Sequence, residues 1–209
     1  MTTQKSIKLS DYEVYPFLIP NIDLDFNVAK DYVVIQALMI IKQKFNTSSK
    51  LVLQGNQIKL ISISIDGKEL HSGDYVLSDN ELIIHKPPKS EFELKIKSQI
   101  DPFTNTSLEG LYLSSDMLTT QCEAEGFRSI CFHPDRPDVL SKYTVRIEAD
   151  RFQYPILLSN GNKKYCAILD NNDNRHEIIW EDPSPKPSYL FALVAGKLNL
   201  VADKYITKS

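Results

Sequence analysis

The chain has 209 residues, of which 42% are hydrophobic and 24% are charged, so it has the composition of a folded globular protein and is not wholly disordered. Its formal net charge of −3 provides no basic surface for nucleic acid. No apolar run approaches the roughly 20 residues of a membrane-spanning helix. We therefore expect neither nucleic acid nor a membrane among its partners.

The first half of the chain predicts β-strands. Residues 31–44 fit a helix or a strand buried on both faces, and their β-branched side chains favour the strand. In residues 58–70, isoleucine alternates with serine up to Asp66-Gly67, a dipeptide typical of a tight hairpin turn. Residues 91–100 alternate apolar and polar side chains, which indicates a half-buried strand.

The second half continues in the same way. Residues 142–150 predict a strand with Tyr143, Val145 and Ile147 facing inward, and residues 154–182 predict strands joined by turns at 160–161 and 171–174. Asp135 is the one good helix start, as the cap of a short turn before Pro137. The Pro-rich residues 181–189 are the one candidate connector, too short to separate independent domains. The pattern predicts an all-β domain in which sheets form a sandwich or a stack.

Three cysteines, Cys122, Cys131 and Cys166, are an odd number at spacings that fit no disulfide framework. The first twenty residues also lack the uninterrupted apolar core of a secretory signal. We therefore expect reduced thiols and a cytoplasmic location.

The chain contains one segment that imitates a zinc motif. His176-Glu177 begins like H-E-x-x-H, but Trp180 stands where the second histidine would be, and the local pattern is that of a strand. The other histidines have no ligand-like spacing, and no phosphate-binding loop or nucleophile elbow is present. We expect no catalytic residue and no metal ligand in this chain.

Residues 119–127, TTQCEAEGF, carry acidic side chains at alternate positions. In an extended strand, Gln121, Glu123 and Glu125 share one face, opposite Cys122 and Ala124. That face is either the solvated edge of a β-domain or a negatively charged notch for an ammonium group. Periodicity alone leaves both interpretations open.

Four blocks of the chain, in order, carry a resemblance to a known family: TQCEAEGFR, PDRPDVL, YPILLSNGN and DPSPKPSYLFALVAG. Together they resemble the N-terminal domain of bacterial aminopeptidase N, in the gluzincin group of zinc metallopeptidases. The likeness extends from about residue 12 to the end of the chain. It implies a saddle-like, multi-sheet β-sandwich domain that precedes a thermolysin-like catalytic domain.

The resemblance implies roles for two residues in binding peptides that have a free N-terminus. Glu123 matches the glutamate that binds the substrate's α-ammonium group, and Gln121 matches the glutamine that lines the pocket for the first side chain. Structural roles are expected for Glu125, Gly126 and Phe127. The zinc motif H-E-x-x-H…E and the exopeptidase motif G-x-M-E-N belong to the next domain of the family.

The expected organisation is therefore a single N-terminal β-domain over residues 1–209, with a core from about 12 to 205, that contacts a catalytic domain not contained in this chain. The longer enzyme would use zinc, and this portion alone would be inactive. One alternative is a stand-alone, non-catalytic β-domain that binds a protein or peptide, although the apolar run 188–201 suits an element covered by a further domain. Another is the related branch that also opens an epoxide, which the block TTQCEAEGFR disfavours.

Overall fold

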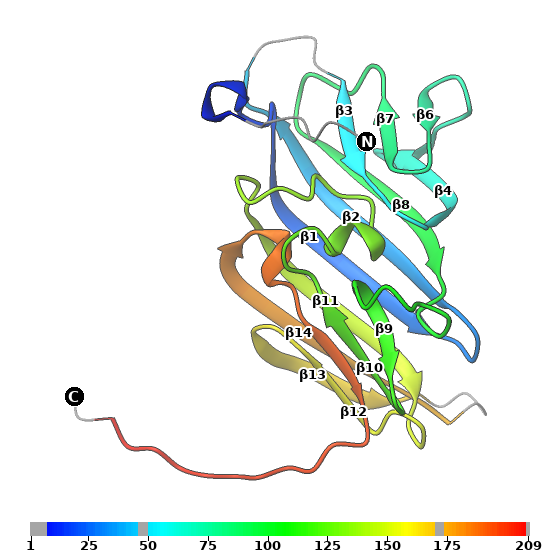
Figure 1. Cartoon of the computed structure of the whole chain (residues 1–209), viewed down its shortest axis with the longest axis vertical. Helices are drawn as coiled ribbons and strands as arrows, with labels where there is room; N and C mark the ends of the chain where they lie inside the picture. The colour runs from blue at the N-terminus through cyan, green and yellow to red at the C-terminus, as the bar shows by residue number, and fades with distance from the viewer. Residues whose placement is uncertain (1–7, 46–49, 170–173, 208–209) are drawn as a thin grey trace, which may run out of the picture.

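The computed structural model describes residues 8–45, 50–169 and 174–207, and within them the chain is all-β, as predicted. The strands form three sheets of eight, four and three strands (Figure 1). Three short 3-10 helices interrupt them: η1 (Leu9–Asp11), η2 (Phe127–Ser129) and η3 (Ser188–Leu190). No helix of the described residues is long and apolar enough to span a membrane.

The eight-stranded sheet runs through the length of the molecule in the order β13-β14-β11-β1-β2-β8-β4-β5 (Figure 1). Its strands are β1 (Phe17–Val28), β2 (Val33–Gln43), β4 (Lys59–Ile65), β5 (Lys68–Glu69), β8 (Phe92–Ile100), β11 (Ser141–Asp150), β13 (Asn162–Ile168) and β14 (Arg175–Lys186). Neighbouring strands are antiparallel except for β1 and β11, which are parallel.

The other two sheets are smaller. The four-stranded sheet has the order β12-β15-β10-β9 and lies in front of the large sheet in Figure 1, whereas the three-stranded sheet, β3-β7-β6, lies at the upper end. Their strands are β9 (Gly110–Ser114), β10 (Met117–Gln121), β12 (Ile156–Ser159) and β15 (Leu193–Gly196), then β3 (Leu51–Gln54), β6 (Tyr75–Leu77) and β7 (Glu81–Ile84).

One hydrophobic core connects the three sheets. It takes the inward-facing residues of the large sheet and side chains of both small sheets into a single buried cluster. Phe26 of β1 stacks on Phe191, which precedes β15, with ring centroids 6.0 Å apart. The core therefore fixes the four-stranded sheet, and with it the end of β10, against the large sheet.

Most strand predictions are confirmed. Residues 33–43 form a strand, although only one of its faces is fully buried and the other is half-buried. The hairpin turn lies at Asp66-Gly67, where both residues have positive φ angles of 49° and 75°. Tyr143, Val145 and Ile147 are buried as expected. The predicted turn at 171–174 falls largely on residues 171–173, which lie outside the described residues.

Two local predictions are wrong. No helix follows Asp135: residues 134–140 are irregular, and the Asp135 carboxylate is buried among other partners. The Pro-rich segment is not a connector, because β14 continues through it to Lys186 and pairs there with Ser141.

Candidate functional site

The segment TTQCEAEGF leaves the strand earlier than the sequence predicts. β10 ends at Gln121, and residues 123–126 form a turn that leads into η2. Cys122 is buried, whereas Ala124 is exposed beside the two glutamates, so the expected alternation of Gln121, Glu123 and Glu125 on one strand face is wrong. We call residues 122–129 the QCE turn, after the sequence Gln121-Cys122-Glu123 at its start.

The QCE turn is closed by backbone contacts that require a glycine at position 126. The Gly126 N–H donates to the Cys122 carbonyl at 2.9 Å, and the Gln121 side-chain amide donates to the Glu123 carbonyl at 3.1 Å. A Cβ atom on Gly126 would lie 2.2 Å from the Gln121 carbonyl oxygen. The backbone therefore folds back so closely that no side chain fits there. The peptide bond between Glu123 and Ala124 is cis.

The two glutamates of the QCE turn differ in their partners. The Glu125 carboxylate is largely exposed and pairs with the Arg128 guanidinium at 3.1 Å. The Glu123 carboxylate is exposed and has no ion pair or hydrogen bond with any residue that the structure describes. Of two acids two positions apart, Glu125 has a cationic partner and Glu123 has none among the described residues, so the Glu123 carboxylate is free to accept an incoming cation.

Aromatic side chains support the QCE turn from below. Phe127 is buried and meets the rings of His133, Tyr143 and Phe191 edge-on, at centroid distances of 5.2, 6.3 and 5.3 Å. Cys122 is buried beside them, and its burial, with the nearby charge of Asp135, raises the pKa of the thiol to about 12. Cys122 is therefore a small core residue rather than a nucleophile at neutral pH.

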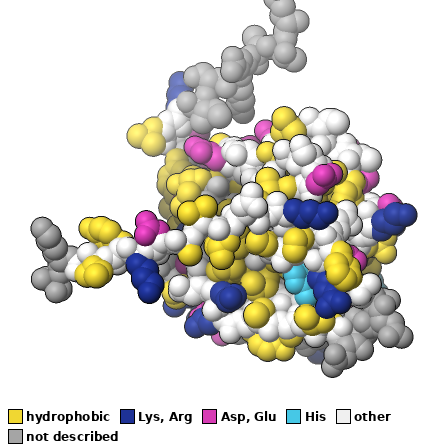
Figure 2. Space-filling view, turned by 90° about the horizontal axis from the view of Figure 1, so that it is seen from below, with side chains coloured by type: hydrophobic (Ala, Val, Ile, Leu, Met, Phe, Trp, Pro, Cys, Tyr) yellow, Lys and Arg dark blue, Asp and Glu magenta, His cyan; other side chains and the backbone are white. Residues whose placement is uncertain are grey.

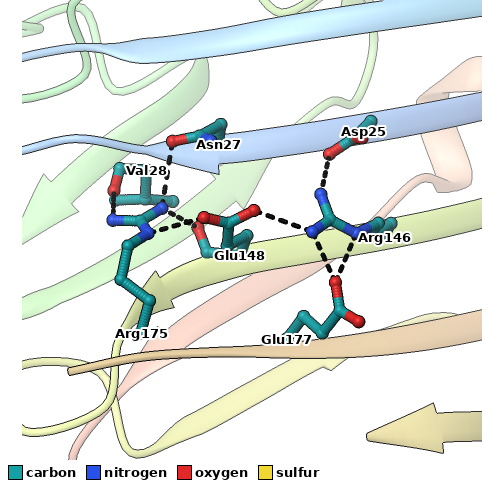
Figure 3. A network of polar contacts seen from close by, with 7 residues as sticks. All are labelled: Asp25, Asn27, Val28, Arg146, Glu148, Arg175 and Glu177. Atoms are coloured by element: carbon teal, nitrogen blue, oxygen red, sulfur yellow. Dashed lines mark hydrogen bonds and ion pairs between the residues drawn. The ribbon is translucent and has the colours of Figure 1, made fainter. Parts of the chain in front are cut away.

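A second polar cluster lies on the large sheet (Figure 3). The Arg146 guanidinium donates to Asp25 at 2.8 Å, to Glu148 at 2.7 Å and to Glu177 at 2.6 Å, while Arg175 donates to Glu148 at 2.6 Å. A hollow of about 340 Å³ lies beside it. Two guanidinium groups pair with three carboxylates across β1, β11 and β14, so the cluster ties these strands together and every carboxylate in it has a partner.

The segment that imitates a zinc motif is a strand, as predicted. In β14 the His176 ring nitrogen Nε2 lies 2.8 Å from the Tyr154 carbonyl oxygen, and Trp180 donates to the Leu157 carbonyl at 3.2 Å. The described residues include no group of three or more His, Cys, Asp or Glu side chains that could hold a metal ion. Glu177 contributes to the cluster around Arg146 instead.

The lower end of the molecule carries another hollow. Seen from below, hydrophobic side chains cover much of the middle of this end, with Lys and Arg side chains around them (Figure 2). A hollow of about 350 Å³ is lined mainly by apolar residues of β12 and β14, together with Cys166. Of its polar lining residues, Glu177 already pairs with Arg146 and His176 with the Tyr154 carbonyl, so the QCE turn remains the candidate site.

The sequence of the chain is similar to those of known aminopeptidases over its whole length. The chain is 46% identical to aminopeptidase N of Caulobacter vibrioides over 207 residues and 42% identical to aminopeptidase N of Escherichia coli over 210 residues. These matches cover 99% and 100% of this chain but only 24% of each relative, so the chain spans about a quarter of their length.

Solved structures show the same likeness. Aminopeptidase A of Legionella pneumophila, in complex with aspartic acid, matches 92% of this chain and 23% of its own, with a TM-score of 0.86 and 36% identity. An M1 zinc metallopeptidase of Deinococcus radiodurans has the same fold at 15% identity, with a TM-score of 0.72 over 87% of this chain and 42% of its own. The model of the Peptidase M1 N-terminal domain matches residues 14–190. The chain therefore belongs to the Peptidase M1 N-terminal domain family.

Proposed function

We propose that the chain is the substrate-anchoring part of a zinc aminopeptidase that removes N-terminal amino acids from peptides. In this proposal Glu123 binds the free α-ammonium group of the substrate and Gln121 lines part of the pocket for the first side chain. The observation that carries it is the contrast within the QCE turn, where Glu125 pairs with Arg128 while Glu123 has no partner among the described residues. The relatives that are aminopeptidases support the reaction class.

The chemistry of an exopeptidase explains why such a carboxylate is useful. Only the first residue of a peptide carries an α-ammonium group, so a carboxylate fixed by the backbone converts that charge into register along the substrate. A charge-assisted hydrogen bond of this kind contributes about 1.5–3 kcal/mol when it is shielded from water. Glu123 would therefore select peptides with a free N-terminus and place the first peptide bond at a constant position.

Zinc enters the proposal through the longer enzyme. The described residues do not offer a set of metal ligands, so the residues that hold zinc are proposed to lie in a catalytic domain that this chain contacts but does not contain. Zinc would supply a polarised carbonyl and an activated water there. This chain contributes binding and orientation. We further propose that it is cytoplasmic and inactive by itself.

The test uses the complete product of the gene and compares hydrolysis of alanyl-p-nitroanilide with that of its N-acetylated form. We expect Glu123→Ala to lower kcat/KM for the free-amine substrate about 100-fold, because the ammonium group loses its counter-charge. The matched change Glu125→Gln removes a carboxylate that is already paired, and we expect it to lower kcat/KM by less than about threefold.

Gln121→Ala should change the preference among first residues more than the overall rate. Equal and mild decreases in kcat/KM in the Glu123 and Glu125 variants would show that the turn has only a structural role. A complete product without aminopeptidase activity would favour the alternative of a non-catalytic β-domain that binds protein or peptide.

A further inference from the structure

Asp135 is a carboxylate placed deep under the QCE turn. Only 4% of its surface is exposed, and among the buried residues that the structure describes it is the only acid. Burying a carboxylate is costly unless it is paired and hydrogen-bonded, so its contacts indicate what it holds in place.

The strongest of these contacts reach the QCE turn. One carboxylate oxygen of Asp135 accepts the backbone N–H of Arg128 at 3.1 Å and its side-chain Nε–H at 3.2 Å. The Arg128 guanidinium also donates to the Asp135 carbonyl at 3.2 Å. Asp135 therefore fixes both the backbone and the side chain of Arg128, the residue that in turn pairs with Glu125.

The other contacts connect Asp135 to distant parts of the chain. Its second carboxylate oxygen accepts the Ser188 hydroxyl at 2.5 Å, and its backbone N–H donates to the Gln54 side chain at 3.1 Å. Ser188 begins η3 and Gln54 ends β3. The QCE turn is thus attached through one buried residue to two segments that belong to the body of the domain.

The position of Glu123 depends on this attachment. Its carboxylate forms no hydrogen bond or ion pair with a described residue, so the backbone of the turn determines where it lies. The strand that precedes it ends at Gln121, so the turn is held by side-chain packing and individual hydrogen bonds. Among these, the Asp135–Arg128 pair is the buried, charged one.

We infer that Asp135 is a positioning residue: through Arg128 it holds the QCE turn so that Glu123 stands at the distance at which it binds the substrate's ammonium group. This inference rests on the proposed role of Glu123. A displacement of about 1 Å at an orienting group is enough to lower the rate of an enzyme about 100-fold. A small shift of the Asp135–Arg128 pair would therefore be sufficient to impair substrate binding.

The experiment compares Asp135→Asn with Asp138→Asn in the complete enzyme. Asp138 is a matched control, since it also pairs with an arginine, Arg136, at 2.8 Å, but has no contact with the QCE turn. We expect Asp135→Asn to raise KM for alanyl-p-nitroanilide about tenfold, with kcat changed by less than about threefold. Asp138→Asn should change KM by less than about twofold.

A double-mutant cycle separates positioning from general stability. If Asp135 acts through Glu123, then Asp135→Asn introduced into the Glu123→Ala enzyme should change KM by less than about twofold, because there is no anchor left to position. A full tenfold increase in that background, or equal KM values for the Asp135 and Asp138 variants, would show that Asp135 only stabilises the fold.

The outcomes also separate this inference from the proposed function. If Glu123→Ala itself leaves kcat/KM within about threefold of the wild type, the ammonium anchor is wrong and the positioning role falls with it. If Asp135→Asn does not fold, Ser188→Ala removes only the hydroxyl that donates to Asp135, and we expect it to raise KM about threefold. An unchanged KM in a folded Ser188→Ala enzyme would then overturn the inference.

Discussion

Each strand of the eight-stranded sheet is held by a ladder of hydrogen bonds to its neighbours, whereas the QCE turn is held by a few side chains from distant segments. In the sheet, for example, β1 pairs with both β2 and β11 along most of its length. In the turn, one carboxylate, that of Asp135, gathers Arg128 and Ser188. The sheet can therefore lose one side chain and keep its shape, while the turn depends on single contacts.

The two regions also differ in what they bury. Among the described residues, the buried side chains of the large sheet are apolar or serine, whereas the one buried histidine, His133, and the one buried acid, Asp135, lie under the QCE turn. Substitutions in the sheet should therefore change stability alone. Substitutions under the turn should also change substrate binding and the response to pH.

The largest expected loss of stability comes from the sheet. Met39 of β2 is fully buried in the core, and Met39→Ala should lower the free energy of unfolding by about 2–5 kcal/mol through lost contacts and a cavity. Urea unfolding of the 209-residue chain measures this change. In the complete enzyme KM should stay the same. A KM that rises as much as in Asp135→Asn would break the distinction between the two regions.

The sequence predicts the sheet much better than the turn, because the sheet follows local patterns and the turn depends on contacts between distant residues. Alternation over residues 91–100 and 142–150 places side chains on one face, and the structure confirms that these faces are buried. The Asp66-Gly67 hairpin is equally local. The QCE turn instead depends on Arg128 meeting Asp135 and on Asp135 meeting Ser188, contacts that periodicity does not register.

The same limit explains why the sequence predicts the wrong role for Asp135. Its place before Pro137 fits a helix cap, but its carboxylate accepts hydrogen bonds from Arg128 and from Ser188, which is 53 positions away. No local rule connects these residues. The resemblance to a family leads only to the proposed roles of Gln121 and Glu123, and it assigns no role to the residues beneath them.

His133 gives an intermediate effect that depends on pH. Burial lowers its pKa to about 3 from an ordinary 6.5, so the folded chain keeps it neutral while the unfolded chain takes up a proton below pH 6.5. The contribution of neutral His133 to the free energy of unfolding is fully present above pH 6.5. Below that pH it falls by about 1.4 kcal/mol per pH unit, down to about pH 3. Between pH 6.5 and pH 5 the loss is about 2 kcal/mol.

His133→Leu should remove this part of the pH dependence. Among the residues that the structure describes, neither ring nitrogen of His133 has a hydrogen-bond partner, so an apolar replacement leaves no other group without its partner. Urea unfolding at pH 7 and pH 5 should therefore show a smaller loss of stability for the variant than for the wild type. Met39→Ala is the control. It keeps His133, so it should be less stable than the wild type by the same amount at both pH values. A variant that keeps the wild-type dependence would show that His133 is not neutral in the folded chain.

The smallest effect, on cysteine alkylation, reports whether the QCE turn is as rigid as the sheet. Cys122 and Cys131 are 3% and 1% exposed, and burial raises the pKa of each thiol to about 12, whereas Cys166 is exposed on the edge strand β13. Since the thiolate is the reactive form, iodoacetamide at pH 8 should modify only Cys166 of the native chain, as read by peptide mass spectrometry. In Asp135→Asn, Cys122 should react faster while Cys131, which follows the turn, changes less. If Cys122 of the wild type reacts as fast as Cys166, the turn opens without any mutation, and Asp135 cannot be what holds it closed.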